Sequence, residues 1–147
     1  MSKLVTIKQA LILRDLGFKE STTRHAYRFD STYYLQPGGI TIKQNVPKHS
    51  AMLAMPTVDQ AIDYIRRKYN IIIFDATEPF VDLNKNSIMY SYKVKLCNKK
   101  WGWNYRKYIG KSKWSADSYA MKRQALWIAF RYIIKENAKR RTNCKNR

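Results

Sequence analysis

The sequence predicts an α+β fold in which antiparallel hairpins and a sheet are covered by three helices. Two stretches carry the same helix-start signal, and a longer stretch near the end has apolar residues at helical spacing. The segments between them alternate apolar and polar residues in neighbouring pairs, which is typical of hairpins. The predicted order is α-β-β-α-β-β-β-α. For a chain of 147 residues, we expect a single α+β domain over 1–139 and a basic tail over 140–147.

The first two helices begin at nearly repeated stretches, TIKQALIL from Thr6 and TVDQAIDYI from Thr57. In each, a glutamine follows the threonine by three residues, at Gln9 and Gln60, which is the Thr-x-x-Gln form of the capping box. Apolar residues at helical spacing follow both boxes, and they predict the second helix over 58–69. Because the residues after the two helices do not match, shared helix-start chemistry explains the repeat better than a duplicated module.

The two helices also carry end signals. Gly17 suits the left-handed position that ends the first helix, with Phe18 placed to fold back on the last turn. The second helix is expected to end near Asn70. Both stretches are therefore expected to be scaffold.

In the first half, the turn signal Pro37-Gly38-Gly39 predicts a hairpin. Its strands are expected near 27–35 and 40–44, where β-prone aromatic and aliphatic residues lie. A loop is expected over 45–56, leading to the second helix.

The second half contains three predicted strands. NIIIFDA predicts a short buried strand at 71–76, and Pro79 argues against a central strand in the loop TEPFVDLNKNS that follows. IMYSYKVKLC, residues 88–97, alternates as a half-buried strand with a basic outer face, and WNYRKYI, residues 103–109, returns as its partner. One side of the 88–97 strand is expected to carry Ile88, Tyr90, Tyr92, Val94 and Leu96, and the other Met89, Ser91, Lys93 and Lys95.

The last helix is expected to begin between Ser115 and Ser118 and to run to about Lys139. Its apolar residues cover more than one stripe and include Trp127 and Ile134. This pattern predicts a helix that is deeply buried or contacts a partner.

Charge is the strongest functional signal. The chain has 29 lysine and arginine residues against 10 acidic residues, a formal net charge of +19. Residues 83–147 hold 18 of these cations and 2 of the acids, a net of +16, whereas residues 1–82 have a net of +3. Such polarised self-repulsion indicates a polyanionic partner, which releases counterions on binding. No membrane partner is expected, because the cations are not confined to one face of an amphipathic helix.

The sequence contains no apolar run of 18 residues, and an amphipathic helix follows Lys3 almost at once. Neither a transmembrane helix nor a signal peptide is therefore expected. Cys97 and Cys144 lie far apart and form no CxxC pair. We expect free thiols in a reducing cytoplasm.

No pattern in the sequence points to catalysis. His25 and His49 have no partner at dyad or ligand spacing. Asp59 and Asp63 share a helix face, but a solvated helix start near the positive dipole end explains them better than a metal does. GKS at 110–112 resembles the end of a phosphate loop, yet the glycine that this motif needs five residues earlier is missing. We therefore expect a non-enzymatic protein without a cofactor, a metal or a small-molecule substrate.

The stretch 93–114 mixes cations with aromatic rings. Cations contact phosphates, and ring faces stack on unpaired bases. For the cations, contact with a polyanion is favoured over a solvated face. For the rings, burial in the core is favoured over stacking, and Trp103 is expected under the last helix. The predicted partner-binding residues are Lys93, Lys95, Lys99, Lys100, Arg106, Lys107, Lys111 and Lys113, and the candidate stacking residues are Trp101, Tyr108 and Trp114.

The hairpin followed by YIGKSKWSADSYAMKRQALWIAF resembles the integrase-type and AP2-type DNA-binding units, which have three strands and one helix. The matching points are Gly110, the polar break after it, and a helix with Ala120, Gln124 and Ala125. The acidic helix start of that family is missing. The resemblance implies, as the alternative function, a DNA-binding regulator that uses the sheet at 88–109.

The layout of the whole chain resembles small accessory proteins of Bacteroidetes phages and prophages. The shared order is a helix ending LGF (16–18), an aromatic hairpin, PT (56–57) opening a helix that ends IRRKYNI (65–71), a tyrosine-rich hairpin, and a closing helix with QAL (124–126). Some such proteins are anti-CRISPR inhibitors. This resemblance implies an RNA-handling target in a bacterial cytoplasm, such as a type VI-B effector with its guide. The leading hypothesis is an accessory protein that binds nucleic acid, RNA in preference to DNA, or a nucleoprotein such as a CRISPR nuclease.

Overall fold

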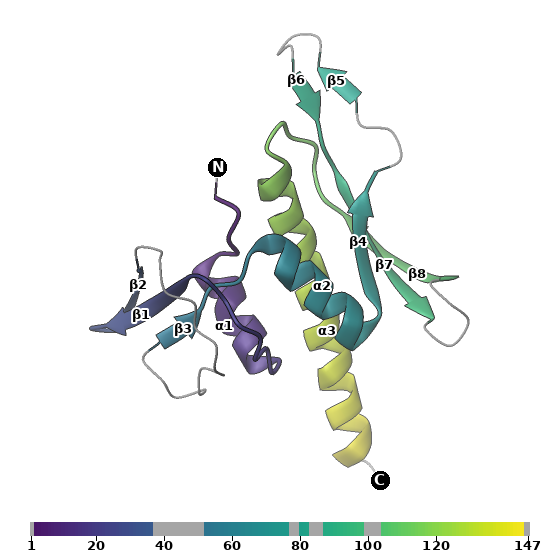
Figure 1. Ribbon diagram of the computed structural model, residues 1–147. Helices are drawn as coiled ribbons and strands as arrows, with labels where there is room; N and C mark the ends of the chain where they lie inside the picture. Colours follow the sequence, from purple (N-terminus) through teal and green to yellow (C-terminus); the bar gives the residue numbers. More distant parts are fainter. Residues whose placement is uncertain (1, 37–51, 77–79, 83–86, 99–103, 146–147) are drawn as a thin grey trace. The chain divides into compact units, whose positions relative to one another are not determined.

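The computed structural model describes residues 2–36, 52–76, 80–82, 87–98 and 104–145 (Figure 1). The chain divides into two compact units, the N-terminal unit Ser2–Tyr64 and the C-terminal unit Ile65–Arg147. Three helices and antiparallel sheets make the fold α+β, as predicted, and the described residues hold three strands more than the predicted order. Helix α2 crosses the boundary between the units, so the single domain expected over 1–139 stays a prediction.

Helix α1 (Ile7–Asp15) has both predicted end signals. The Gln9 N–H donates to Thr6 Oγ1 at 3.1 Å, and the Thr6 N–H donates to Gln9 Oε1 at 3.1 Å. At the other end Gly17 has a φ of 92°, and the Phe18 N–H donates to the Leu13 carbonyl at 2.9 Å. These are the contacts of a capping box and a Schellman motif, so both predictions are confirmed.

Helix α2 (Val58–Tyr69) completes only part of the predicted box. The Gln60 N–H donates to Thr57 Oγ1 at 3.1 Å, as expected. The Gln60 side chain instead donates from Nε2 to the Ser21 carbonyl at 2.8 Å, which ties α2 to the segment after α1. Asn70, with a φ of 57°, ends the helix as predicted.

The N-terminal sheet has the order β2-β1-β3, with β1 at His25–Phe29, β2 at Thr32–Leu35 and β3 at Met52–Ala54. The predicted hairpin was wrong in two respects. The single strand expected near 27–35 is itself a hairpin, because Asp30 and Ser31 adopt φ values of 50° and 65° and form its two-residue turn. β3 lies within the expected loop 45–56, while the expected second strand at 40–44 lies outside the described residues.

The two faces of this sheet differ in burial. Ala26 and Leu53 lie opposite each other and are fully buried. On the alternate positions, Tyr27 lies between Tyr34 and Met52, and all three side chains are exposed. The outer face of the N-terminal sheet is thus aromatic.

The C-terminal sheet has the order β4-β7-β8, with β4 at Ile71–Asp75, β7 at Tyr92–Asn98 and β8 at Asn104–Lys111. The strands predicted at 71–76 and 103–109 are confirmed. Strands β5 (Phe80–Asp82) and β6 (Ser87–Met89) form a separate two-stranded hairpin. The loop expected across 77–87 was therefore wrong at β5, and Pro79 lies outside the described residues.

The single strand expected over 88–97 is divided into β6 and β7. Ile88 is exposed and Met89 is buried, the reverse of the expected alternation, whereas from Tyr92 to Lys95 the alternation is confirmed. Hydrogen bonds to Ser112 fix the chain at the interruption between β6 and β7. The hydroxyl of buried Ser91 donates to the Ser112 carbonyl at 3.0 Å, and the Tyr92 N–H donates to Ser112 Oγ at 2.9 Å.

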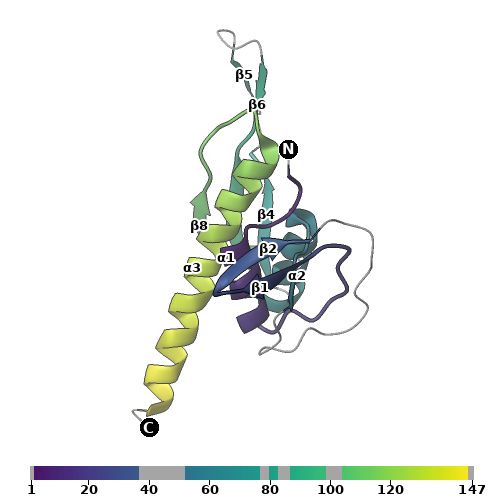
Figure 2. The same ribbon diagram turned by 90° about the vertical axis from the view of Figure 1, so that its left-hand side faces the viewer.

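Helix α3 (Ser118–Lys145) begins after Asp117, whose Oδ1 accepts from the Ala120 N–H at 3.0 Å. It continues six residues past the expected end at Lys139, so the basic tail expected over 140–147 is helical as far as Lys145. Its C-terminal turns run past the end of the sheet in both views (Figure 1 and Figure 2). No helix in the described ranges is long and apolar enough to cross a membrane.

Helix α3 packs on one face of the C-terminal sheet, and it approaches β8 closely at Gly110. A Cβ atom added there would lie 2.9 Å from Cγ2 of Ile128. Because Ile128 is β-branched and stiff in a helix, it cannot easily move aside. Glycine at this position therefore sets the distance between α3 and β8.

We expect Gly110→Ala to lower the free energy of unfolding by about 1–3 kcal/mol, because the added methyl group overpacks the interface with Ile128. Denaturant titration measures this change. In an Ile128→Ala background the same substitution should cost clearly less. Equal costs in the two backgrounds would contradict the contact.

Tyr92 generates a pH prediction. Burial raises the pKa of Tyr92, and the nearby Asp75 carboxylate raises it too, while a hydrogen bond to Ser118 and the charge of Lys122 oppose them. The unfolded tyrosine, with a pKa of about 10, thus loses its proton first as the pH rises. Stability from neutral Tyr92 is complete below about pH 10 and is lost as the pH rises through the higher folded value.

The unfolding free energy of the wild type should therefore fall more steeply above about pH 10 than that of Tyr92→Phe. Denaturant titrations of the two proteins across this range measure the difference. Parallel pH profiles would show that Tyr92 is not responsible.

Candidate nucleic-acid interface

The register of the C-terminal sheet assigns its side chains to two faces. Val94 lies opposite both Ile73 and Gly110, and this row faces α3, because Gly110 approaches Ile128. The alternate rows belong to the opposite face, which we call the open face. It consists of Ile72 and Phe74 on β4, Lys93 and Lys95 on β7, and Tyr108 and Lys111 on β8.

Two cations meet directly across strands on the open face. Lys93 on β7 lies opposite Lys111 on β8, and Lys95 follows on the same face of β7. Like charges placed directly opposite each other destabilise an antiparallel pair. A polyanionic ligand would neutralise this repulsion. Binding of such a ligand would therefore explain a lysine pair that is unfavourable for folding.

Aromatic rings are interleaved with these cations. Lys95 Nζ lies 5.2 Å from the centroid of the Phe74 ring, and Lys111 Nζ lies 5.3 Å from that of Trp114. Tyr108, directly opposite Lys95, is 46% exposed. An exposed ring beside cations is the combination that binds single strands, through stacking on bases and charge on phosphates.

The structure brings together only some of the predicted binding residues. Lys93, Lys95, Lys111 and Tyr108 share the open face. Exposed Lys113 and partly buried Trp114 follow directly after β8. Arg106 lies in β8, but its side chain is not described, and Lys99, Lys100, Trp101 and Trp103 lie outside the described residues.

Lys107 belongs to the other face, so the predicted cations that the structure describes do not all share one surface. It lies opposite Leu96, and its Nζ is 5.4 Å from the ring centroid of Tyr132 on α3. The cause is the register shift at Val94/Lys95, which lies between Lys107 and Lys111 along β8; a second shift follows at Leu96/Cys97. Each shift adds a residue on β8 and turns the following side chains over.

Sequence reasoning missed Phe74 as part of the site. NIIIFDA was predicted to be a short buried strand, whereas only Ile71 and Ile73 are buried and Ile72 and Phe74 are partly exposed. The period-two pattern of a one-sided strand is hidden there, because both faces carry apolar side chains.

The described residues form neither a phosphate loop nor a metal site. Gly110 and Lys111 belong to β8, and Ser112 is buried in hydrogen bonds to β7, so GKS forms no phosphate loop. The described residues include no cluster of three or more histidine, cysteine or acidic side chains that could hold a metal ion. His49 lies outside the described residues.

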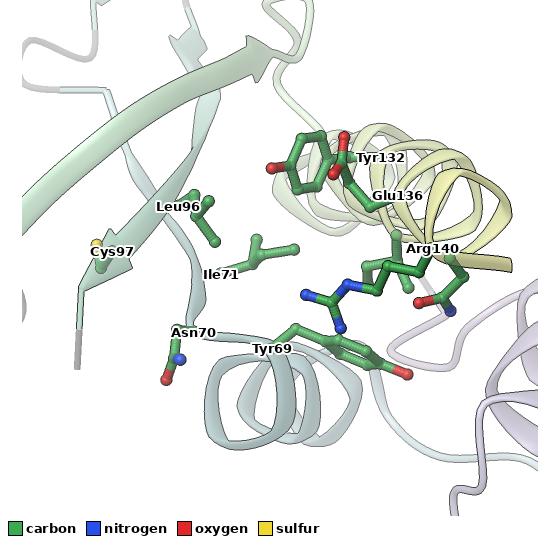
Figure 3. Close-up of a pocket in the computed structure, with 10 residues that line it drawn as sticks. Tyr69, Asn70, Ile71, Leu96, Cys97, Tyr132, Glu136 and Arg140 are labelled. Carbon is green, nitrogen blue, oxygen red and sulfur yellow. The ribbon is translucent and has the colours of Figure 1, made fainter. Parts of the chain in front are cut away.

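A pocket of about 220 Å³ lies between the C-terminal half of α3, the end of α2 and strands β4 and β7 (Figure 3). Arg140 extends from α3 toward Tyr69 across it, and Leu96 and Cys97 line its far side. Burial raises the pKa of the Cys97 thiol, which outweighs the opposing charge of Lys95. The thiol therefore stays protonated at neutral pH and is a poor nucleophile.

The like-charge pair makes a prediction about stability. Lys93→Glu should raise the free energy of unfolding by roughly 0.2–1 kcal/mol, because it converts the pair with Lys111 into an opposite-charge pair. Lys113→Glu, outside the strand pairing, is the matched control and should change stability less. Denaturant titration of the wild type and the two variants measures these changes. A lower free energy of unfolding for Lys93→Glu would contradict the repulsion between Lys93 and Lys111.

The open face brings together cations and aromatic rings of the described residues. Its members come from three strands, and its charge and aromatic rings are both set by the register. No protein-family model, no curated protein and no solved structure matches the chain.

Proposed function

We propose that this protein binds single-stranded nucleic acid on the open face of the C-terminal sheet and acts without catalysing a reaction. The observation that supports this most is the direct cross-strand pairing of Lys93 with Lys111 beside exposed Tyr108. The cations attract phosphates, and the ring offers a face to an unpaired base.

RNA is the proposed ligand in preference to DNA, in the context that the resemblance to phage accessory proteins implies. In that context the protein occupies RNA held by a nucleoprotein effector, such as a CRISPR nuclease, in a bacterial cytoplasm and so inhibits it. The buried, free thiol of Cys97 is compatible with a reducing compartment. The formal charge of +19 supports rapid, electrostatically steered association.

A duplex-DNA regulator is the second candidate. The observation that favours it is a three-stranded antiparallel sheet with a helix packed on one face, since sheets can read a groove of DNA. The exposed ring of Tyr108 argues against it, because the bases of a duplex are already stacked on one another. Competition between single-stranded and duplex probes separates the two candidates.

The binding prediction uses an oligouridine of about 16 nucleotides, the upper end of single-domain site sizes. Its affinity, measured by fluorescence anisotropy, should fall steeply between about 50 and 200 mM salt, since each phosphate contact releases counterions. It should exceed that for a duplex of equal length. A flat salt response, or preference for the duplex, would remove the single-strand proposal.

Variants of the open face make the test specific. Tyr108→Ala should weaken binding by about 1–3 kcal/mol through lost stacking, whereas Tyr108→Phe should retain it. Lys93→Glu should bind more weakly although it folds more stably. Melting temperatures measured in parallel show that a loss of affinity is not a loss of fold.

A further inference from the structure

A groove follows the outer edge of β8, beside α3. Two hollows of about 380 and 320 Å³ share Lys111, Ile128 and Arg131 and therefore adjoin, and we call them together the edge groove. Gly110 and Ile128, at their close approach, line its floor. β8 is an edge strand among the described residues, so its outer backbone groups border this groove.

The charge of the edge groove has one sign. All four charged residues that line it are basic, and they come from both of its sides. Lys111 and Lys113 lie on the β8 side, and Arg131 and Lys135 lie on α3. The rings of Trp127 and Tyr132 also line it.

The two cations on each wall are separated by similar distances along the chain. Arg131 and Lys135 are one helical turn apart, a rise of about 6 Å. Lys111 and Lys113 are two residues apart in chain that leaves an extended strand, a distance of about 6.6 Å. Successive phosphates of an extended nucleic-acid strand are separated by a similar distance. The Arg131 Nε also donates to the Trp127 carbonyl at 3.4 Å, which holds the guanidinium along the helix.

Protection of the β8 edge against pairing with other chains explains only the cations on the β8 side of the groove. Lysines on an edge strand discourage pairing with other chains, and Lys111 fits that role. That role gives no reason for Arg131 and Lys135 on the helix wall. Four cations facing one groove repel each other, and a row of phosphates would relieve that repulsion.

We propose that the edge groove holds the sugar–phosphate backbone of the same single strand whose bases stack on the open face. This inference rests on the proposed function. Lys111 belongs to both surfaces, so a strand that follows β8 can direct its bases to the open face and its phosphates toward α3.

The test is the salt slope of binding to the same oligouridine. Each lost phosphate contact lowers the slope by about 0.7 for a single strand, so Arg131→Gln combined with Lys135→Gln should lower it by about 1.4. The matched control, Lys139→Gln with Arg141→Gln, removes the same charge from exposed positions further along α3 and should leave the slope nearly unchanged. An unchanged salt slope for the Arg131→Gln, Lys135→Gln variant would contradict phosphate binding in the edge groove. An equal decrease of the slope in this variant and in the control would contradict it too.

A second measurement covers the case in which the groove variant does not fold. Wild-type protein is titrated with oligothymidine and with the same oligomer carrying uncharged methylphosphonate linkages. Loss of affinity and of the salt slope supports backbone contact, and equal binding overturns it. Weakened binding by Tyr108→Ala with no effect of the groove variant would retain the proposed function and reject the groove, whereas no binding by the wild type would reject both.

Discussion

The close approach of α3 to β8 at Gly110 decides which surfaces of the C-terminal unit a ligand can reach. With no side chain at this position, Ile128 reaches the sheet backbone, and the row of Ile73, Val94 and Gly110 is covered. The alternate rows are left on the other face. The same contact lines the edge groove, so glycine at this position affects both the packing of α3 and the shape of that groove.

Electrostatics links stability to function in this unit. A cross-strand pair of lysines and four cations around one groove are expected to reduce the stability of the free protein, and a bound polyanion would reverse that effect. Aromatic rings partly compensate in the free state, since Lys95, Lys107 and Lys111 each lie over a ring face. Under the proposed function, these ring contacts would hold the cations in place before a ligand binds and so lower the entropy cost of binding.

The sequence predicted what depends on neighbouring residues. The fold class, the Thr6 box, the Gly17 end and the helix over 58–69 follow from local capping and periodicity, and each is confirmed. The turn at Asp30-Ser31 was missed because its residues are not the usual asparagine–glycine or aspartate–glycine pair.

The site was predicted less well than the helices. The cations of 93–114 were identified, but their division between two faces depends on register shifts between β7 and β8, which follow from long-range pairing. Phe74 and Arg131 lie outside that stretch and reach the same surfaces only through tertiary packing. Period-two alternation carries no information about which strand lies next to which.

The aromatic outer face of the N-terminal sheet has a consequence for the protein in solution. Phe29 is 66% exposed and lies beside Tyr27 and Tyr34, a surface that would bring copies of the chain together. The formal charge of +19 keeps them apart at low ionic strength, but its reach shrinks to about 10 Å at 0.1 M salt. Concentrated protein should therefore cloud as salt is added, the reverse of ordinary salting-in, and clear again on dilution of the salt.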